Sequence, residues 1–163
     1  MQRWSTVTRT VWLPEPASVL GELPGELRVE VYDGAPGTPP PAGRDEVEFY
    51  VTPYLMGVET LEIIRQMPRL QVVQTLTAGV EHVRPYLRDG ITLCNAKGVH
   101  DASTAELAVA LVLANLRALP DFVRGQDRQE WRHARHESLA DKTVLIVGYG
   151  AIGEALERRL DGF

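Results

Sequence analysis

The sequence lacks the features that mark disulfide-bonded, zinc-binding and membrane-spanning proteins. Cys94 is the only cysteine among 163 residues, which excludes an internal disulfide and a four-cysteine zinc site. No uninterrupted apolar run reaches the ~18 residues of a membrane-spanning helix. The N-terminal segment also has no apolar stretch typical of a secretory signal. We therefore expect a cytoplasmic protein that does not enter a membrane.

Basic charge is also in short supply, since 17 basic side chains face 22 acidic ones, for a net charge of −5. A nucleic-acid interface needs clustered Lys and Arg, whereas here the basic residues are scattered, so we expect no nucleic-acid partner. The four histidines do not pair with carboxylates at metal-ligand spacing, so we expect no metal site. The hydrophobic fraction of 44% is ordinary for a folded protein, which excludes disorder.

Hydrophobic patterning in the first hundred residues predicts strands that alternate with helices. Apolar and polar residues alternate over 7–13, 27–32 and 47–51, and short apolar runs follow at 70–76 and 91–94. Helices are predicted over 55–64 and 80–87, and a Pro- and Gly-rich loop over 34–43. This order is typical of an open, parallel α/β sheet with both faces covered.

The next segment predicts helices of a different kind. Ser103-Thr104-Ala105-Glu106 has the pattern of a capping box, and an almost wholly apolar helix from Ala105 to Leu119 would end at Pro120. A second helix is plausible between Asp121 and His136, with Trp131 as its apolar anchor. A helix that is apolar on all sides must be buried on all sides. We therefore expect a partner chain or further residues to cover it.

The clearest motif is the G-x-G-x-x-G of residues 148–153, between a predicted strand over 143–147 and a predicted amphipathic helix. In dinucleotide-binding folds the first glycine allows a tight turn, the second a close approach of the diphosphate, and the third close helix–strand packing. The alternative is a tight strand-to-helix turn without a ligand. An acidic residue that binds the ribose is expected ~20 residues further on. Only ten residues follow Gly153, so we expect the sequence to be cut within a domain.

A second candidate site is Thr77-Ala78-Gly79-Val80, which directly follows the predicted strand over 70–76. Consecutive backbone N–H groups at the carboxyl end of a strand can bind an anion, but from the residues alone an ordinary strand-to-helix turn is the simpler interpretation. Tyr54 holds the equivalent place after the preceding strand, where it faces a ligand or packs against the protein.

Taken in order, these motifs resemble the N-terminal half of the D-isomer-specific 2-hydroxyacid dehydrogenases. The residues that carry the resemblance are Thr77–Val80, Asn95–Gly98, Ser103–Leu113, Trp131 and Leu139–Gly153. The resemblance implies a flavodoxin-like α/β substrate-binding domain over 1–98. It also implies, over 99–163, a dimerisation helix and the first strand–helix unit of a Rossmann NAD(P)-binding domain.

The resemblance also implies roles for individual residues. The backbone amides of Ala78 and Gly79 would bind the substrate carboxylate, and Tyr54 would lie near the substrate. NAD or NADP would be held by the following residues: Thr104, Gly148, Tyr149, Gly150, Ala151, Ile152 and Gly153. The family more often has Arg or Ser where Ala151 stands, which removes a side-chain contact to phosphate. The helix Ala105–Leu119 would form a homodimer.

The activity that the resemblance implies is hydride transfer between NAD(P)H and a small 2-oxoacid such as glyoxylate or hydroxypyruvate. The family's catalytic Arg, Glu and His lie in the second half of a complete enzyme, so no catalytic residue is identified here. We expect residues 1–163 alone to be inactive. Two alternatives are a non-catalytic, dinucleotide-sensing interaction module of the same fold and the remnant of a truncated gene. Formate and phosphite dehydrogenases share the fold and are not distinguished by these residues.

Overall fold

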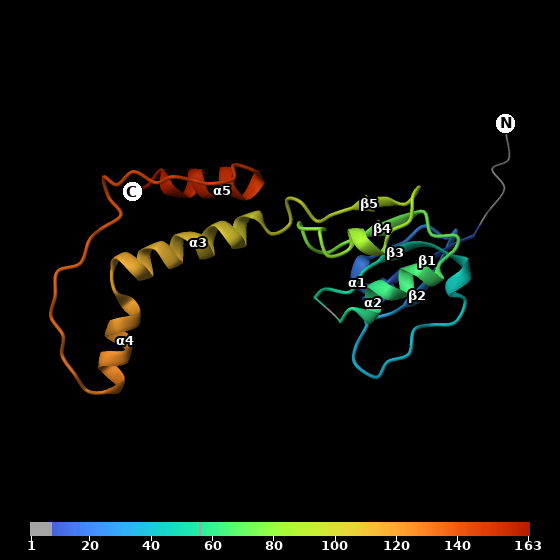
Figure 1. The fold of residues 1–163 in the computed structure, drawn as a ribbon, viewed down its shortest axis with the longest axis horizontal. Coiled ribbons are helices and arrows are strands. Elements are labelled where there is room, and N and C mark those ends of the chain that lie inside the picture. Colours follow the sequence, from blue (N-terminus) through green and yellow to red (C-terminus); the bar gives the residue numbers. More distant parts are fainter. Residues whose placement is uncertain (1–7, 56) are drawn as a thin grey trace. The chain divides into compact units, whose positions relative to one another are not determined.

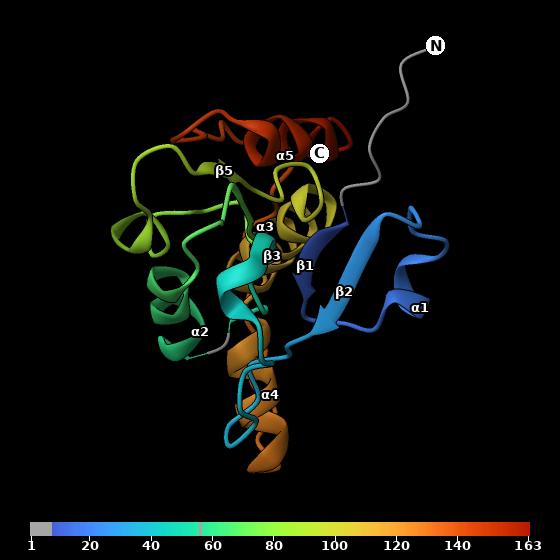
Figure 2. The same cartoon turned by 90° about the vertical axis from the view of Figure 1, so that its right-hand side faces the viewer.

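The chain forms two compact units, residues 1–96 and residues 97–163, in a computed structural model that describes residues 8–55 and 57–163. The first unit contains a parallel sheet with short helical segments, and the second contains longer helices (Figures 1 and 2). The boundary between residues 98 and 99 that the resemblance implies separates a substrate-binding from a cofactor-binding domain, and as a statement about function it stays a prediction.

Five parallel strands make up the sheet of the first unit. They are β1 (Arg9–Leu13), β2 (Leu27–Val31), β3 (Val47–Val51), β4 (Val72–Gln74) and β5 (Thr92–Cys94). Their order across the sheet is β2-β1-β3-β4-β5, the order of flavodoxin-like sheets. The predicted α/β class is confirmed, although β4 is shorter than the predicted strand over 70–76.

The core lies on one face of this sheet. Trp12, Tyr50 and Val73 stand beside one another on β1, β3 and β4, and each is fully buried. The helical segment formed by α2 (Glu59–Glu62) and the 3-10 turn η2 (Ile63–Gln66) packs on this face and buries Ile63 and Ile64. Burial of large apolar side chains stabilises a fold by roughly 1.5–3 kcal/mol for each side chain. In place of the predicted helix over 55–64, the structure thus has one turn of α-helix followed by a 3-10 turn.

The sequence predicts a sheet that is covered on both faces. The face opposite the core is instead only partly covered. Val11, Val29, Phe49 and Val72 share this face and line an apolar groove of about 280 Å³. Beside it, among the residues that the structure describes, lies α1 (Ala17–Leu20), a single turn in which no residue is buried.

Two further 3-10 turns complete the first unit, η1 (Arg44–Glu46) and η3 (Arg84–Tyr86). The predicted helix over 80–87 is wrong, because only η3 forms there. Pro85 has no N–H group and cannot donate the hydrogen bond to Glu81 that an α-helix would need. The loop over 34–43 contains no helix or strand, as predicted.

The second unit contains α3 (Asp101–Leu116), α4 (Leu119–Asp127) and α5 (Ala151–Leu160). The predicted helix Ala105–Leu119 is wrong at both ends. Helix α3 starts four residues earlier, and Pro120 lies in the first turn of α4 instead of ending a helix. Proline is well tolerated there because the first N–H groups of a helix have no partner within it.

The predicted capping box is also wrong. Because α3 begins at Asp101, Ser103 lies inside its first turn and donates a hydrogen bond to the carbonyl of His100 at 3.2 Å. Glu106 does not reach back toward Ser103 but pairs with Arg159 of α5 at 3.1 Å. This ion pair joins α3 to α5, which pack side by side.

Two further predictions fail in the second unit. Helix α4 ends at Asp127, and Trp131 is 92% exposed instead of serving as an apolar anchor. Residues 143–147 do not form a strand, because no other part of residues 97–163 is a strand that could pair with them. A strand requires hydrogen bonds to a neighbouring strand.

Helix α3 remains apolar on all sides, as its composition predicts. Ala105 is its only buried residue, whereas Leu107 and Leu111 are 59% and 61% exposed. Within residues 8–55 and 57–163 we find no single helix that meets the length and hydropathy of a membrane span; α3 and α4 do so only together, with a 65° bend between them.

Candidate functional site

The first candidate site lies at the carboxyl edge of the sheet. Tyr54 follows β3, Thr77–Gly79 follow β4, and Asn95 follows β5. Since β3, β4 and β5 are neighbouring parallel strands, the three segments leave the sheet at the same edge. Ligands of open α/β sheets bind at this edge.

Hydrogen bonds hold three successive carbonyl groups of the loop after β4. The Thr77 carbonyl accepts from the Ala96 N–H at 3.0 Å and from the Thr75 hydroxyl at 2.8 Å. The Ala78 carbonyl accepts from the Asn95 side-chain amide at 2.8 Å. The Gly79 carbonyl accepts from the Thr77 hydroxyl at 2.7 Å. These bonds hold the loop in one conformation.

The direction of these carbonyls sets the direction of the amides. In a planar trans peptide the C=O and the following N–H point opposite ways. With three successive carbonyls turned toward protein donors, the N–H groups of Ala78, Gly79 and Val80 point away from those donors. Adjacent N–H groups directed outward can bind a carboxylate. The geometry is therefore compatible with the predicted role of Ala78 and Gly79.

Sequence reasoning missed the residues that hold this loop. Thr75 is buried, and its hydroxyl lies beside the strand end from which the loop departs. Asn95 belongs to Asn95–Gly98, one of the motifs that carry the family resemblance, but the resemblance implied no role for this residue. The available signal was a short polar side chain at the end of each of two adjacent apolar strands.

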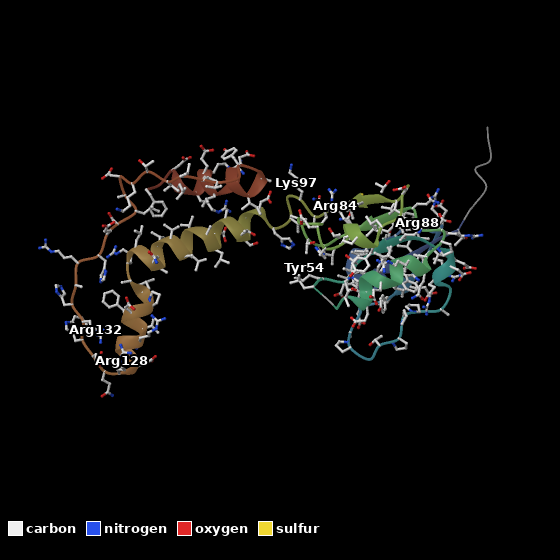
Figure 3. All side chains as sticks on the ribbon, viewed as in Figure 1. Tyr54, Arg84, Arg88, Lys97, Arg128 and Arg132 are labelled. Atoms are coloured by element: carbon white, nitrogen blue, oxygen red, sulfur yellow. The ribbon has the colours of Figure 1, made fainter. Side chains whose placement is uncertain are left out.

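Tyr54 lies in the loop after β3, and its side chain is directed outward from that loop (Figure 3). It is 49% exposed, so its ring does not belong to the core. Of the two interpretations of Tyr54, packing inside the protein and facing a ligand, the exposure favours the second. Its role near a substrate stays a prediction.

The second candidate site is the glycine-rich loop that leads into α5, and its three glycines differ in what the protein requires of them. Gly148 has a φ of +87°, which side chains other than glycine rarely adopt. At Gly153 an added Cβ would lie 3.0 Å from the Gly148 carbonyl oxygen and 3.4 Å from the Ile146 side chain. At Gly150 an added Cβ would meet nothing within 4 Å.

The open space at Gly150 is the feature that fits a ligand. Turn geometry accounts for glycine at 148 and close packing accounts for it at 153, but neither accounts for glycine at 150. The backbone there can be approached closely, as a dinucleotide diphosphate requires. Gly148 and Gly153 thus have the turn and packing roles predicted for the pattern, and the diphosphate contact at Gly150 stays a prediction.

The start of α5 adds donors to this loop. The Glu154 N–H bonds the Gly150 carbonyl at 2.9 Å, which is the first hydrogen bond of the helix. By helix geometry, the N–H groups of Ala151, Ile152 and Gly153 precede that bond and point out of the helix end, where the dipole favours an anion. Because Ala151 offers only a methyl group, contacts to phosphate here would come from the backbone.

Thr104 lies at the same end of the helix pair as this loop. It is exposed in the first turn of α3, and α3 and α5 run side by side with their N-termini at one end (Figure 1). The residues predicted to bind the cofactor therefore all lie in the second unit, at the N-terminal end of this helix pair. Tyr54, Ala78 and Gly79 belong to the first unit.

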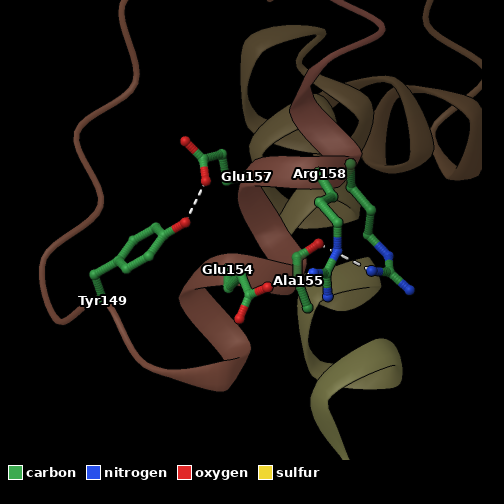
Figure 4. Close-up of polar contacts among 6 residues, drawn as sticks. Tyr149, Glu154, Ala155, Glu157 and Arg158 are labelled. Carbon is green, nitrogen blue, oxygen red and sulfur yellow. Dashed lines mark hydrogen bonds and ion pairs between the residues drawn. The ribbon is translucent and has the colours of Figure 1, made fainter.

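Two acidic side chains of α5 lie close to the glycine-rich loop, and both are engaged. The Tyr149 hydroxyl donates a hydrogen bond to the Glu157 carboxylate, which raises the pKa of this tyrosine (Figure 4). Glu154 forms an ion pair with Arg158 at 2.5 Å. In residues 8–55 and 57–163 no three His, Cys, Asp or Glu side chains are grouped so as to hold a metal ion.

Comparisons with known proteins identify relatives. The family model for the D-isomer specific 2-hydroxyacid dehydrogenase, NAD binding domain, matches residues 109–163. Mouse (Mus musculus) glyoxylate reductase/hydroxypyruvate reductase is 37% identical over 101 residues, which cover 58% of this chain and 31% of the relative. Glyoxylate reductase of Pyrococcus furiosus is 30% identical over 170 residues, which cover 96% of this chain and 49% of the relative.

A solved structure agrees with these matches. NADPH-dependent glyoxylate/hydroxypyruvate reductase from Sinorhizobium meliloti, in complex with NADP and sulfate, superposes with a TM-score of 0.71 and is 25% identical. The superposition covers 94% of this chain and 49% of the reductase. The chain thus spans about half the length of this reductase and of the Pyrococcus relative, and about a third of the length of the mouse relative.

Proposed function

This chain belongs to the D-isomer specific 2-hydroxyacid dehydrogenase family, and we propose that it supplies the substrate-binding and diphosphate-binding loops of an NAD(P)-dependent oxidoreductase. The proposed reaction transfers hydride from NAD(P)H to the carbonyl carbon of a small 2-oxoacid, and a proton to its oxygen, to give the 2-hydroxyacid. Glyoxylate and hydroxypyruvate are the proposed substrates, since relatives of this chain are reductases of these acids.

The fixed loop after β4 is the observation that carries the substrate proposal. The Ala78 and Gly79 N–H groups point away from the donors that hold the preceding carbonyls, those of Thr77 and Ala78, so they can donate to a carboxylate without rearrangement. A preorganised pair of donors binds an anion more tightly than a flexible loop, because no ordering cost is added on binding. Tyr54, at the same sheet edge, is proposed to border the substrate.

For the cofactor, the proposal assigns the diphosphate to Gly148–Gly153 and the N-terminal end of α5. When bound, NADH or NADPH supplies the hydride. The chain's own contribution is to hold the diphosphate through backbone N–H groups and to exclude side chains at Gly150. Thr104, at the same end of the helix pair, is proposed to border the cofactor.

Backbone ¹⁵N NMR titrations of the 163-residue chain test the two loops separately. We expect NADPH to shift the amide signals of Gly148, Gly150 and Ala151, and glyoxylate to shift those of Ala78 and Gly79. Gly150→Ala should weaken NADPH binding, because its Cβ would stand where the diphosphate approaches the backbone, and should leave the helical circular dichroism of α5 unchanged, because that Cβ meets no protein atom. No amide shift at millimolar NADPH would overturn the cofactor proposal, and none at millimolar glyoxylate would overturn the substrate proposal.

We further propose that two copies of the chain pair through α3, the structural form of the predicted helix Ala105–Leu119. The exposed side chains of Leu107 and Leu111 support this, since contiguous exposed apolar surface marks an interaction site. Light scattering should give a dimer for the unmodified chain and a monomer for Leu111→Glu. Val19→Glu, which changes an equally exposed position of the first unit, should stay dimeric. A monomeric unmodified chain would contradict this.

The remaining proposals concern location and excluded partners. From its charge and hydropathy we propose that the protein resides in the cytoplasm and binds neither nucleic acid nor membranes. Cell fractionation with recovery in the pellet, or a gel shift with duplex DNA or RNA, would contradict them.

A further inference from the structure

Tyr149 connects the glycine-rich loop to α5 through a contact that the G-x-G-x-x-G pattern does not require. Its hydroxyl donates to the Glu157 carboxylate, one turn beyond Gly153 along the helix (Figure 4). Its ring lies over the glycine, because a Cβ added at Gly153 would be 3.5 Å from Tyr149 Cδ2. The side chain therefore follows the helix surface from Gly153 to Glu157.

The charge around the loop gives this contact a second consequence. A dinucleotide diphosphate is anionic, and a free carboxylate nearby would compete with it for the backbone N–H donors. Arg158 holds the Glu154 carboxylate at 2.5 Å, and the Tyr149 hydroxyl holds that of Glu157. Neither acidic group is left to compete for the backbone N–H groups at the start of α5.

We propose that Tyr149 and Glu157 form a latch that positions the backbone of residues 148–150 for the diphosphate of NAD(P). The latch is this hydroxyl–carboxylate hydrogen bond together with the ring resting on Gly153. It rests on the proposed cofactor site and adds to it: both are positioning residues and act through the loop backbone. A tyrosine hydroxyl is protonated, and so a donor, throughout the neutral range, and the hydrogen bond to Glu157 raises the pKa of Tyr149 further.

Variants separate the hydrogen bond from the charge. Tyr149→Phe removes the donor and keeps the ring, Glu157→Ala removes the acceptor, and Glu157→Gln keeps an acceptor oxygen without the charge. Glu154→Gln is the matched control, since Glu154 is an acidic residue of the same helix whose partner is Arg158 and not the loop.

The first measurement is the dissociation constant of NADPH from amide-shift titrations of the full 163-residue chain. We expect Tyr149→Phe and Glu157→Ala to weaken binding about 3- to 10-fold, the effect of one net hydrogen bond. Glu157→Gln and Glu154→Gln should stay within about twofold of the unmodified chain. Combining Tyr149→Phe with Glu157→Ala should add little to either change. Unchanged binding by Tyr149→Phe would overturn the latch.

The second measurement is the titration of the Tyr149 phenol, followed by the ¹³C shift of Cζ. In the unmodified chain its pKa should lie above the ordinary value, since the hydrogen bond to Glu157 is the largest cause of the rise. Glu157→Ala should lower it markedly and Glu154→Gln only slightly. A ring that only packs on α5 would titrate alike in all three proteins, and that result would also refute the latch.

The two proposals fail in different ways. If NADPH shifts no amide of residues 148–153 in the unmodified chain, the cofactor site is wrong, and the latch has no diphosphate to position. If the unmodified chain binds NADPH and Tyr149→Phe binds it equally well, the cofactor site stands and only the latch is wrong.

Discussion

The two units differ in how they satisfy their backbone and their apolar side chains. In residues 1–96 each of the five strands pairs with at least one neighbour, and a shared core includes the fully buried Trp12, Tyr50 and Val73. In residues 97–163 the longest helix, α3, buries one residue, and the extended segment 143–147 has no strand beside it. Leu145 and Val147 of that segment are 84% and 89% exposed.

This difference teaches that similar apolar content serves two purposes. In the first unit apolar residues alternate along strands, so one face closes on a core within the unit. In the second unit, apolar side chains project from all sides of α3, and one neighbouring helix cannot cover all of these sides. The first unit is thus held by internal burial, whereas the second presents apolar surface, as the proposed dimer requires.

The largest expected effect separates the two units by truncating one side chain in each. Ile64→Ala removes a side chain that is 1% exposed in the core and should lower the free energy of unfolding by roughly 3 kcal/mol. Leu111→Ala removes one that is 61% exposed and should change it by less than about 0.5 kcal/mol. Urea unfolding of both variants, at a concentration where the chain is monomeric, measures the contrast.

Concentration provides the control for that comparison. If α3 mediates pairing, the effect of Leu111→Ala should grow with protein concentration, because association adds to apparent stability. Equal losses of stability for the two variants in dilute solution would show that α3 is buried within its own unit, and the contrast between the units would not hold.

The next effect concerns Gly153, the tightly packed glycine of the loop that leads into α5 in the second unit. Gly153→Ala places a Cβ 3.0 Å from a backbone carbonyl oxygen and should destabilise the loop and α5 by roughly 1–3 kcal/mol. Gly25→Ala, in the first unit, meets nothing within 4 Å and should be neutral or slightly stabilising. Amide hydrogen exchange of α5 measures the first effect, and unchanged protection in Gly153→Ala would contradict it.

The elements that the sequence predicted best are those with a local signal. Alternation located β1, β2 and β3 closely, because a half-buried strand imposes period-2 patterning on its own residues. The segment 143–147 has an equally strong apolar pattern and yet forms no strand, because strand formation depends on a partner that local sequence does not contain. The prediction for Pro120 was wrong for a related reason. Proline can follow the end of one helix or lie in the first turn of the next, and the local sequence does not distinguish the two.

The candidate site shows the same limit. The glycine pattern predicted the loop before α5, since Gly148 and Gly153 each have a local steric cause. The anchoring of the other loop depends on Asn95 reaching Ala78 across 17 residues of chain, which no local pattern encodes. Similarly, the contact between Tyr149 and Glu157 can be predicted only once the ring is known to lie on Gly153, one helical turn before Glu157.

The smallest contrast deletes the same hydroxyl group in both units. Tyr50 is fully buried and donates to the Thr60 carbonyl at 2.9 Å, so Tyr50→Phe should cost about 1–2 kcal/mol of stability. The Tyr149 hydroxyl bonds Glu157 at the surface, so Tyr149→Phe should leave the urea midpoint unchanged. A similar loss in both variants would mean that the two hydroxyls are equally buried.

Alkaline pH sharpens this last contrast, because burial raises the pKa of Tyr50 well above its ordinary value of 10.0. In the unfolded chain this phenol ionises near pH 10, but in the folded chain it stays protonated. Its contribution to stability is therefore complete below about pH 10 and is lost as pH rises toward the folded pKa. Unfolding followed between pH 8 and 11 should show a steeper alkaline loss in the unmodified chain than in Tyr50→Phe. Parallel curves would indicate that water reaches the Tyr50 hydroxyl and that the core of the first unit is less closed than its burial implies.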